Sequence, residues 1–293
     1  MKIKAETLFL KSRNISIPVL PQNYRATLAL CQDKMVSSKQ LEKIISLDYG
    51  LSWRILRFVN SAFFSLEKND FFSFRHIIVL IGLDNLKNNI LRAKTIDIKK
   101  ANLNTIYLGV GLFISFISEK LATELHLDSD KAKVCGLFQN LGEVVVTIAI
   151  PKIIQMCLLP GSFIIEKKRF SRFCGGYDPR SLGDDLAKFW NFPELIRVAI
   201  NPDNFDLKSL SKGDQKIILI IIALNELITT ILSKEKKEFN ITNFFCELEN
   251  ITKLKKEKIE DIFLDSYYKF EKKCPFFYFH LEKIGFFKKF KIE

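Results

Sequence analysis

The sequence predicts an all-α protein built from two abutting helical lobes, and three observations support this fold class. From about residue 21 onward, apolar residues recur at the three- and four-residue spacing of amphipathic helices. Few segments show the alternation of apolar and polar residues that is typical of a half-buried strand. The chain has 293 residues, 48% of them hydrophobic, with only 12 Gly and 8 Pro. It can therefore bury one large core or two smaller ones.

Residues 1–100 are expected to form the N-terminal lobe. Pro21 suits a helix start, and Ser37 or Ser38 is expected to cap the next helix. Asn60 should end the third helix, because Asn tolerates left-handed geometry and its amide can bond loose backbone groups. A Phe-rich loop over residues 63–74 is expected to pack on the core. The predicted helices are 24–31, 41–45, 51–58, 77–81 and about 83–93.

Residues 101–293 are expected to form the second lobe, after a polar, basic boundary at residues 97–104. Its first helix is long and apolar, and Ser129 or Asp130 is expected to cap the second. The C-terminal helices carry many lysines and aromatic residues, which favours packing over disorder. The main predicted segments are the helices 106–125 and 217–232, the breaks at 175–179, 190–193 and 201–203, and the tail 254–293.

Several features predict a soluble, cytoplasmic protein. The most hydrophobic stretch, residues 217–232, is interrupted by Asn225 and Glu226 and falls short of the ~20 apolar residues that span a bilayer. We therefore expect no transmembrane segment. The N-terminus lacks the apolar region of a signal peptide. The six cysteines are scattered and contain no C-x-x-C pair, so reduced thiols are expected.

Two sequence blocks carry a resemblance to a known family. The first is the proline-leucine-proline entry of residues 17–21, and the second runs over residues 44–64 and contains an Arg-x-x-Asn-Ser-Ala pattern at 57–62. With the apolar run at 78–83, they resemble the HDOD family over roughly residues 15–235. That resemblance implies a helical N-terminal lobe joined to a lobe related to HD-domain metal phosphohydrolases, and a role in bacterial signal transduction.

The resemblance also locates a degenerate site in the second lobe. Residues 136–143 stand where an active HD protein has Gly-x-x-His-Asp-x-Gly-Lys, so Gln139 and Asn140 replace the metal-binding pair. The earlier helix, which supplies a histidine in active relatives, offers Val110 or its neighbours 109 and 111. No histidine remains at these places. The resemblance therefore implies a vestigial cleft that contacts a ligand or partner through Val110, Gln139, Asn140, Pro179, Arg180 and Asn201.

This substitution pattern predicts a protein that is not an enzyme and needs no metal or other cofactor. A metal hydrolase needs several His and Asp ligands to acidify a bound water, whereas side-chain amides are neutral. The three histidines, His76, His126 and His280, are far apart in sequence. No P-loop, G-x-S-x-G or H-E-x-x-H motif is present. Cys174 and the pair Asp184-Asp185 are interpreted as structural.

We therefore expect a non-enzymatic regulatory module that binds a protein partner or a small signalling nucleotide and acts in trans. The alternative is a basic protein that binds nucleic acid or an anionic surface. It rests on the formal charge of +12 and on tail lysines beside aromatic residues, which suit phosphates and stacked bases. A solvated lysine face, or the codon bias of an AT-rich genome, also explains this charge. The candidate contacts are Lys255, Lys256, Lys288 and Lys289.

Overall fold

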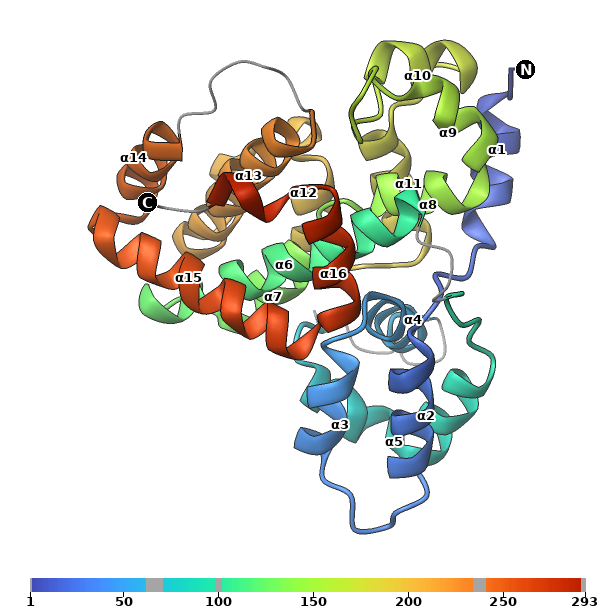
Figure 1. Ribbon diagram of the computed structural model, residues 1–293. Coiled ribbons are helices and arrows are strands. Elements are labelled where there is room, and N and C mark those ends of the chain that lie inside the picture. The colour runs from blue at the N-terminus through green and yellow to red at the C-terminus, as the bar shows by residue number, and fades with distance from the viewer. Residues whose placement is uncertain (1, 62–70, 98–101, 234–240, 291–293) are drawn as a thin grey trace.

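The computed structural model describes residues 2–61, 71–97, 102–233 and 241–290, and within these ranges the chain is helical. These ranges contain two isolated β-bridges, Val19 with Thr95 and Leu158 with Ile165, and no strand. The prediction of an all-α protein is confirmed. Figure 1 shows α2 to α5 gathered at one end of the molecule and the later helices stacked beside and above them.

Helices α2 to α5 follow the predicted order, with the two helices expected around residue 82 joined across a kink in α5, whereas α1 is not among the predicted helices. Ser37 caps α3 through a capping box, in which its side chain accepts from Gln40 N and the Gln40 side chain accepts from Ser37 N. Asp48 caps α4 by accepting from Leu51 N. The helices are α1 (Ala5–Arg13), α2 (Pro21–Leu30), α3 (Ser38–Ile45), α4 (Tyr49–Val59) and α5 (Phe74–Leu91).

The remaining helices pack around α6, whose 22 residues are mostly buried. Helices α7, α8, α13, α15 and α16 all contact it. They are α6 (Leu103–Glu124), α7 (Ser129–Phe138), α8 (Leu141–Ala149), α9 (Pro151–Cys157), α10 (Lys167–Phe173), α11 (Pro179–Phe189), α12 (Glu194–Ile200), η1 (Pro202–Asn204), η2 (Leu207–Ser209), α13 (Lys212–Ser233), α14 (Ile241–Thr252), α15 (Lys256–Lys273), α16 (Pro275–Lys283) and η3 (Phe287–Phe290).

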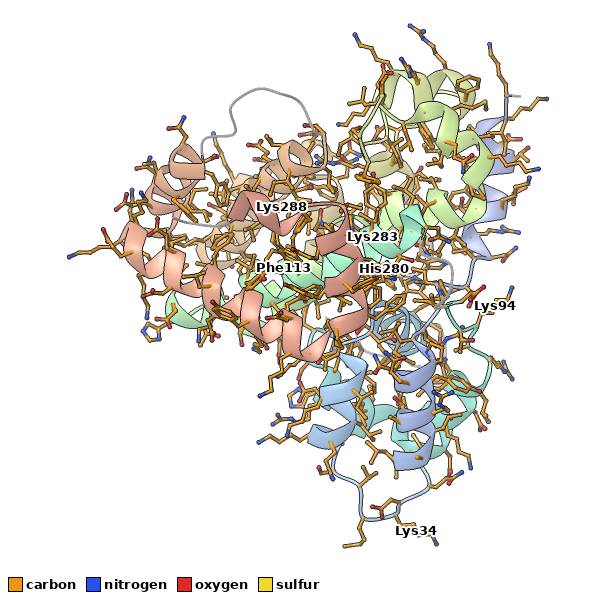
Figure 2. The ribbon with its side chains drawn as sticks, in the orientation of Figure 1. Lys34, Lys94, Phe113, His280, Lys283 and Lys288 are labelled. Atoms are coloured by element: carbon orange, nitrogen blue, oxygen red, sulfur yellow. The ribbon has the colours of Figure 1, made fainter. Side chains whose placement is uncertain are left out.

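The aromatic tail packs on this central helix. The ring of Phe113 in α6 lies 5.4 Å from that of Phe270 and 5.3 Å from that of Phe287, both edge to face (Figure 2). Such aromatic pairs add stability beyond their buried area. The tail is therefore part of the second lobe's core, as its aromatic content predicts.

The N-terminal helix α1 packs against α8 and α11 rather than against α2 to α5 (Figure 1). Ile3 N donates to the Phe173 carbonyl at 2.8 Å, and Trp190 Nε1 donates to the Arg13 carbonyl at 3.3 Å. The division at residue 100 stays a prediction, since residues 98–101 lie outside the described ranges. Residues 62–70, which hold much of the Phe-rich segment, lie outside them too.

The expectation of no transmembrane segment is wrong on length and composition. Three helical stretches are long and apolar enough to cross a bilayer. They are α6, residues 129–149 (α7 with α8) and α13, with mean hydropathies of 1.4, 1.2 and 2.0. The sequence argument required an uninterrupted apolar run, whereas a span tolerates Asn225 and Glu226 when its mean hydropathy is high. Within the fold, 89%, 78% and 56% of these windows are buried against other helices.

Two local expectations differ from the structure and one is confirmed. Asp128, one residue earlier than expected, caps α7 by accepting from Lys131 N. Gly82 interrupts α5 with non-helical angles, φ 74° and ψ 164°, and separates two helical segments at a kink, as expected from the predicted helices 77–81 and 83–93. Asn60 ends α4 with φ −83° and not in left-handed geometry, while its amide donates to the Leu56 carbonyl at 2.8 Å, as expected for a structural role.

Candidate functional site

Five of the six predicted cleft residues line one cavity of about 310 Å³. Its walls come from α6, the α7–α8 junction, the starts of α10 and α11, the loop before α10, and α13. The five are Val110, Gln139, Asn140, Pro179 and Arg180. The sixth, Asn201, is not among the lining residues. It follows α12 and is buried, and its Nδ2 makes no hydrogen bond to any residue that the structure describes.

Close contact between α8 and α11 shapes the floor of this cavity. A Cβ atom on Gly142 would lie 1.8 Å from the Pro179 carbonyl oxygen, so only glycine permits the approach. Asp178 caps α11 through its Oδ1, which accepts from Arg180 N and Ser181 N. The cap and the glycine together place the Arg180 side chain beside the α7–α8 junction.

Asn140 is held by protein groups on both ends of its amide. Its Nδ2 donates to the Tyr107 carbonyl at 2.7 Å, and Tyr49 Oη donates to its Oδ1 at 3.4 Å. Tyr49 belongs to α4 and Tyr107 to α6, so the amide joins the two lobes. Its buried position is therefore explained by structure, and the expected ligand contact is not needed to account for it.

Gln139 differs from Asn140 because its side-chain amide has no hydrogen-bond partner among the described residues. Its side chain is 1% exposed, and neither Oε1 nor Nε2 makes a hydrogen bond within the part of the chain that the structure describes. An unsatisfied buried polar group costs ~1–3 kcal/mol. The amide thus offers one acceptor and a pair of donor hydrogens to whatever fills the cavity.

Glu143 is a further lining residue, which the sequence reasoning did not single out. Its Oε2 is sealed from solvent and has no hydrogen-bond partner among the described residues. Burial raises the pKa of this carboxyl, while the positive charges of Arg180 and Lys167 oppose the rise. A signal was available, because residue 143 stands where the HD pattern has a lysine, and a glutamate there reverses the charge.

The cavity residues do not fit a catalytic metal ion. Gln139 and Asn140 present neutral amides, and Val110 and Pro179 have no ligating side-chain atom. Across the described ranges, no three His, Cys, Asp or Glu side chains cluster as a metal site requires. His76 is exposed in α5, His126 follows α6, and His280 packs on Phe276 in α16.

The other polar candidates have structural partners. Burial raises the pKa of the Cys174 thiol to about 12, which leaves little thiolate for nucleophilic attack. Asp184 pairs with Arg197 at 2.8 Å, and Asp185 accepts from Tyr177 Oη at 2.8 Å. The two acids lie in the middle of α11, which begins at Pro179.

The tail lysines are not gathered into one site. Lys255 and Lys256 lie at the start of α15, where Lys256 pairs with Glu260 at 3.6 Å. Lys288 is exposed beside Phe287, whose ring packs on Tyr267 (Figure 2). Tyr267 is eleven residues from Lys256, roughly 17 Å along the helix. The side chain of Lys289 lies outside the described residues.

The chain belongs to the HDOD family, whose model matches residues 17–204. Among solved structures, it is similar to the MmoQ response regulator of Methylococcus capsulatus, with 18% identity and a TM-score of 0.64 over 85% of this chain and 98% of that one. A virulence factor (cj0248) of Campylobacter jejuni gives 16% identity and a TM-score of 0.62 over 87% and 94%.

A protein of Treponema pallidum with no described function is 28% identical over 191 residues. The match covers 61% of this chain and 36% of that relative, so the chain spans just over a third of its length. The likeness to solved structures fixes the fold. We name the cavity the HD-derived cleft after the resemblance that predicts five of its lining residues.

Proposed function

We propose that this protein is a non-enzymatic signalling module whose HD-derived cleft binds a small polar ligand and passes the binding event to a protein partner. Membership of the HDOD family supports the signalling role, and the MmoQ structure is titled a response regulator. The absence of hydrolysis follows from the amides that replace the metal-binding pair, since they cannot support an activated water.

The observation that carries the proposal is the unpartnered Gln139 amide in the cleft. Proteins normally satisfy buried polar side chains, and an exception calls for an explanation. A ligand with adjacent donor and acceptor atoms would satisfy both ends of this amide, as a nucleobase edge does. Water molecules could bridge the same atoms in the free protein, and the ligand would displace them.

The ligand class that fits is a mononucleotide. The cavity of about 310 Å³ lies at the lower end of small-molecule pockets, which suits one nucleotide rather than two. The Gln139 amide would pair with the base, while Arg180 and Lys167 would meet the phosphate. Glu143 would favour a ligand that donates a hydrogen bond to its Oε2.

The test is calorimetric titration of the protein with linear and cyclic adenine and guanine mononucleotides, without added metal. Gln139→Met keeps the side-chain length and removes both polar atoms, so binding should weaken by about tenfold or more. The matched control is Gln32→Met, because Gln32 is exposed and remote from the cleft. A mononucleotide that binds both variants equally well, or no mononucleotide binding at all, would refute the assignment.

A further inference from the structure

A second concave site lies between the two lobes and collects basic side chains. It is a groove of about 280 Å³, bounded by α3 and α5 on one side and by α6, α7 and α15 on the other. Its cations outnumber its carboxylates by three. The cations are Lys39, Lys43, Arg75, Lys133, Lys269 and Lys273.

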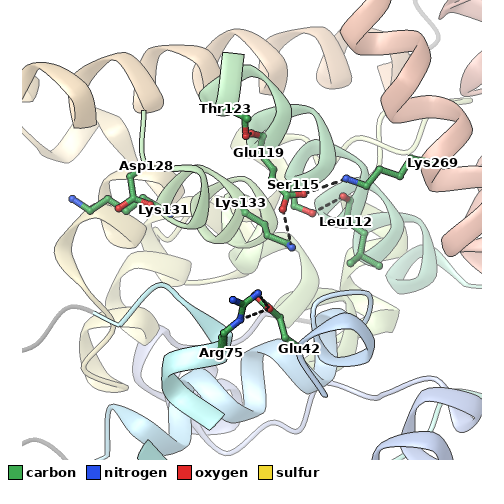
Figure 3. Close-up of polar contacts among 10 residues, drawn as sticks. All are labelled: Glu42, Arg75, Leu112, Ser115, Glu119, Thr123, Asp128, Lys131, Lys133 and Lys269. Carbon is green, nitrogen blue, oxygen red and sulfur yellow. Dashed lines mark hydrogen bonds and ion pairs between the residues drawn. The ribbon is translucent and has the colours of Figure 1, made fainter. Parts of the chain in front are cut away.

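Two of the three carboxylates of the groove, Glu42 and Glu119, are engaged by part of this charge, as Figure 3 shows, while Asp130 makes no ion pair within the described ranges. Arg75 Nη2 lies 3.1 Å from Glu42 Oε2. Glu119 is shared, with its Oε1 3.1 Å from Lys133 Nζ and its Oε2 3.6 Å from Lys269 Nζ. The ammonium group of Lys133 points toward the Arg75–Glu42 pair of the other lobe (Figure 3). Cations from both lobes therefore face one another across the groove.

The remaining lysines of the groove have no carboxylate partner. Within the described ranges, Lys39, Lys43 and Lys273 make no ion pair. The pKa of Lys273 is lowered, first by partial burial and then by the positive charge of Lys269. Like charges held this close repel one another, and a bound anion would relieve that repulsion.

We propose that this inter-lobe groove binds a compact, multiply charged phosphate anion of the diphosphate or triphosphate class. Such an anion carries several negative charges in a small volume, which matches the charge excess and the size of the groove. Lysine ammonium groups bind phosphate as rotatable point charges. The Arg75 guanidinium is occupied by Glu42, so Lys39, Lys43 and Lys273 are the free donors. The anion would join α3 to α15 and so hold the lobes together.

This inference is independent of ligand binding in the HD-derived cleft. The groove shares no lining residue with the cleft: from α6 it takes Phe116 and Glu119, whereas the cleft takes Tyr107 and Val110. A triphosphate could reach the protein as the free ion or as part of a nucleotide. The experiment below separates these two sources.

The test is calorimetric titration with sodium triphosphate, ATP and sodium sulfate, each at a constant ionic strength of about 0.15 M. Triphosphate should bind more tightly than sulfate. Lys43→Gln with Lys273→Gln should weaken triphosphate binding by about tenfold or more, because two nearby charges are lost. The matched control, Lys34→Gln with Lys94→Gln, removes the same charge from exposed sites outside the groove and should leave affinity unchanged (Figure 2).

If triphosphate and ATP bind with equal affinity, the phosphate chain is the recognised group. If ATP binds more tightly than triphosphate, also in the Gln139→Met variant, the groove contacts the nucleoside as well. Circular dichroism confirms that both double variants fold. The inference is overturned if triphosphate binds no more tightly than sulfate, or if the groove and control variants weaken it equally. It is also overturned if duplex DNA binds with this groove dependence and triphosphate does not.

Discussion

Two adjacent residues of the cleft, Asn140 and Gln139, should respond oppositely when their polar atoms are removed. Asn140→Leu eliminates the hydrogen bonds to the Tyr107 carbonyl (2.7 Å) and from Tyr49 Oη (3.4 Å). Gln139→Met eliminates no hydrogen bond within the described part of the chain, because neither polar atom has a partner. Both replacements keep a side chain of similar size, so changes in cavity volume are small.

The magnitude for Asn140→Leu follows from these two contacts. The lost bond to Tyr107 is worth ~1 kcal/mol, and the stranded Tyr49 hydroxyl costs a further ~1–2 kcal/mol because it is fully buried. No helix cap is lost, since the Asn140 side chain makes no capping bond. The free energy of unfolding should fall by about 2–3 kcal/mol. For Gln139→Met it should stay within about 0.5 kcal/mol or rise.

The assay is urea unfolding followed by circular dichroism at one pH, with the midpoint and slope fitted for each variant. Gln32→Met serves as a surface control. An unchanged midpoint for Asn140→Leu would show that its contacts contribute nothing. A loss of more than about 1 kcal/mol for Gln139→Met would show that the amide has structural partners, which would remove the main support for a ligand there.

Three further predictions concern stability and chemistry. Asn60→Leu should lower the free energy of unfolding by about 1 kcal/mol, because the Leu56 carbonyl loses the side-chain amide donor and keeps the bond from Asn60 N; an unchanged urea midpoint would contradict this. The pKa of Glu143 is raised in the folded state, so the folded protein holds this proton more tightly than the unfolded chain does. The stabilisation from this proton is complete below the pKa of the unfolded state and is lost as the pH rises through the pKa of the folded state. Between about pH 5 and 8, the urea midpoint should therefore fall less with rising pH in Glu143→Gln than in the unchanged protein. Equal slopes of midpoint against pH would refute the raised pKa of Glu143. The protein should hydrolyse no cyclic nucleotide, nucleoside phosphate or phosphomonoester above background with Mn, Mg or Fe; turnover lost in a Gln139→Ala, Asn140→Ala variant would show a working active site.

Much of the fold is readable from local sequence, because helices depend on periodicity and on side chains close in the chain. The capping box of Ser37 and Gln40, the end of α4 at Asn60 and the buried run of α6 all follow from residues within one helix. The break at Gly82 follows from the sequence as well, since a positive φ of 74° suits glycine.

The resemblance placed six residues in one cleft, five of which the structure brings together, but it treated Gln139 and Asn140 as equivalent. The sequence states only that both carry amides. Their difference depends on Tyr49, which is 91 residues from Asn140 and is brought within reach by the fold. The role of Glu143 also depends on the fold, which buries its carboxyl group near the positive charge of Arg180.

The sequence by itself determined the helical class and the order of the main helices, because these follow from residue identity and short-range spacing. The residues of the cleft came from the resemblance to the HDOD family. The tertiary structure decided which polar atoms of the cleft have partners and which basic residues meet. The tail lysines that are close in sequence are spread along α15 and beyond it, whereas Lys43 and Lys273, 230 residues apart in sequence, line one groove. Charge and hydrogen-bond satisfaction depend on distances in space, and only the packing of the two lobes sets those distances.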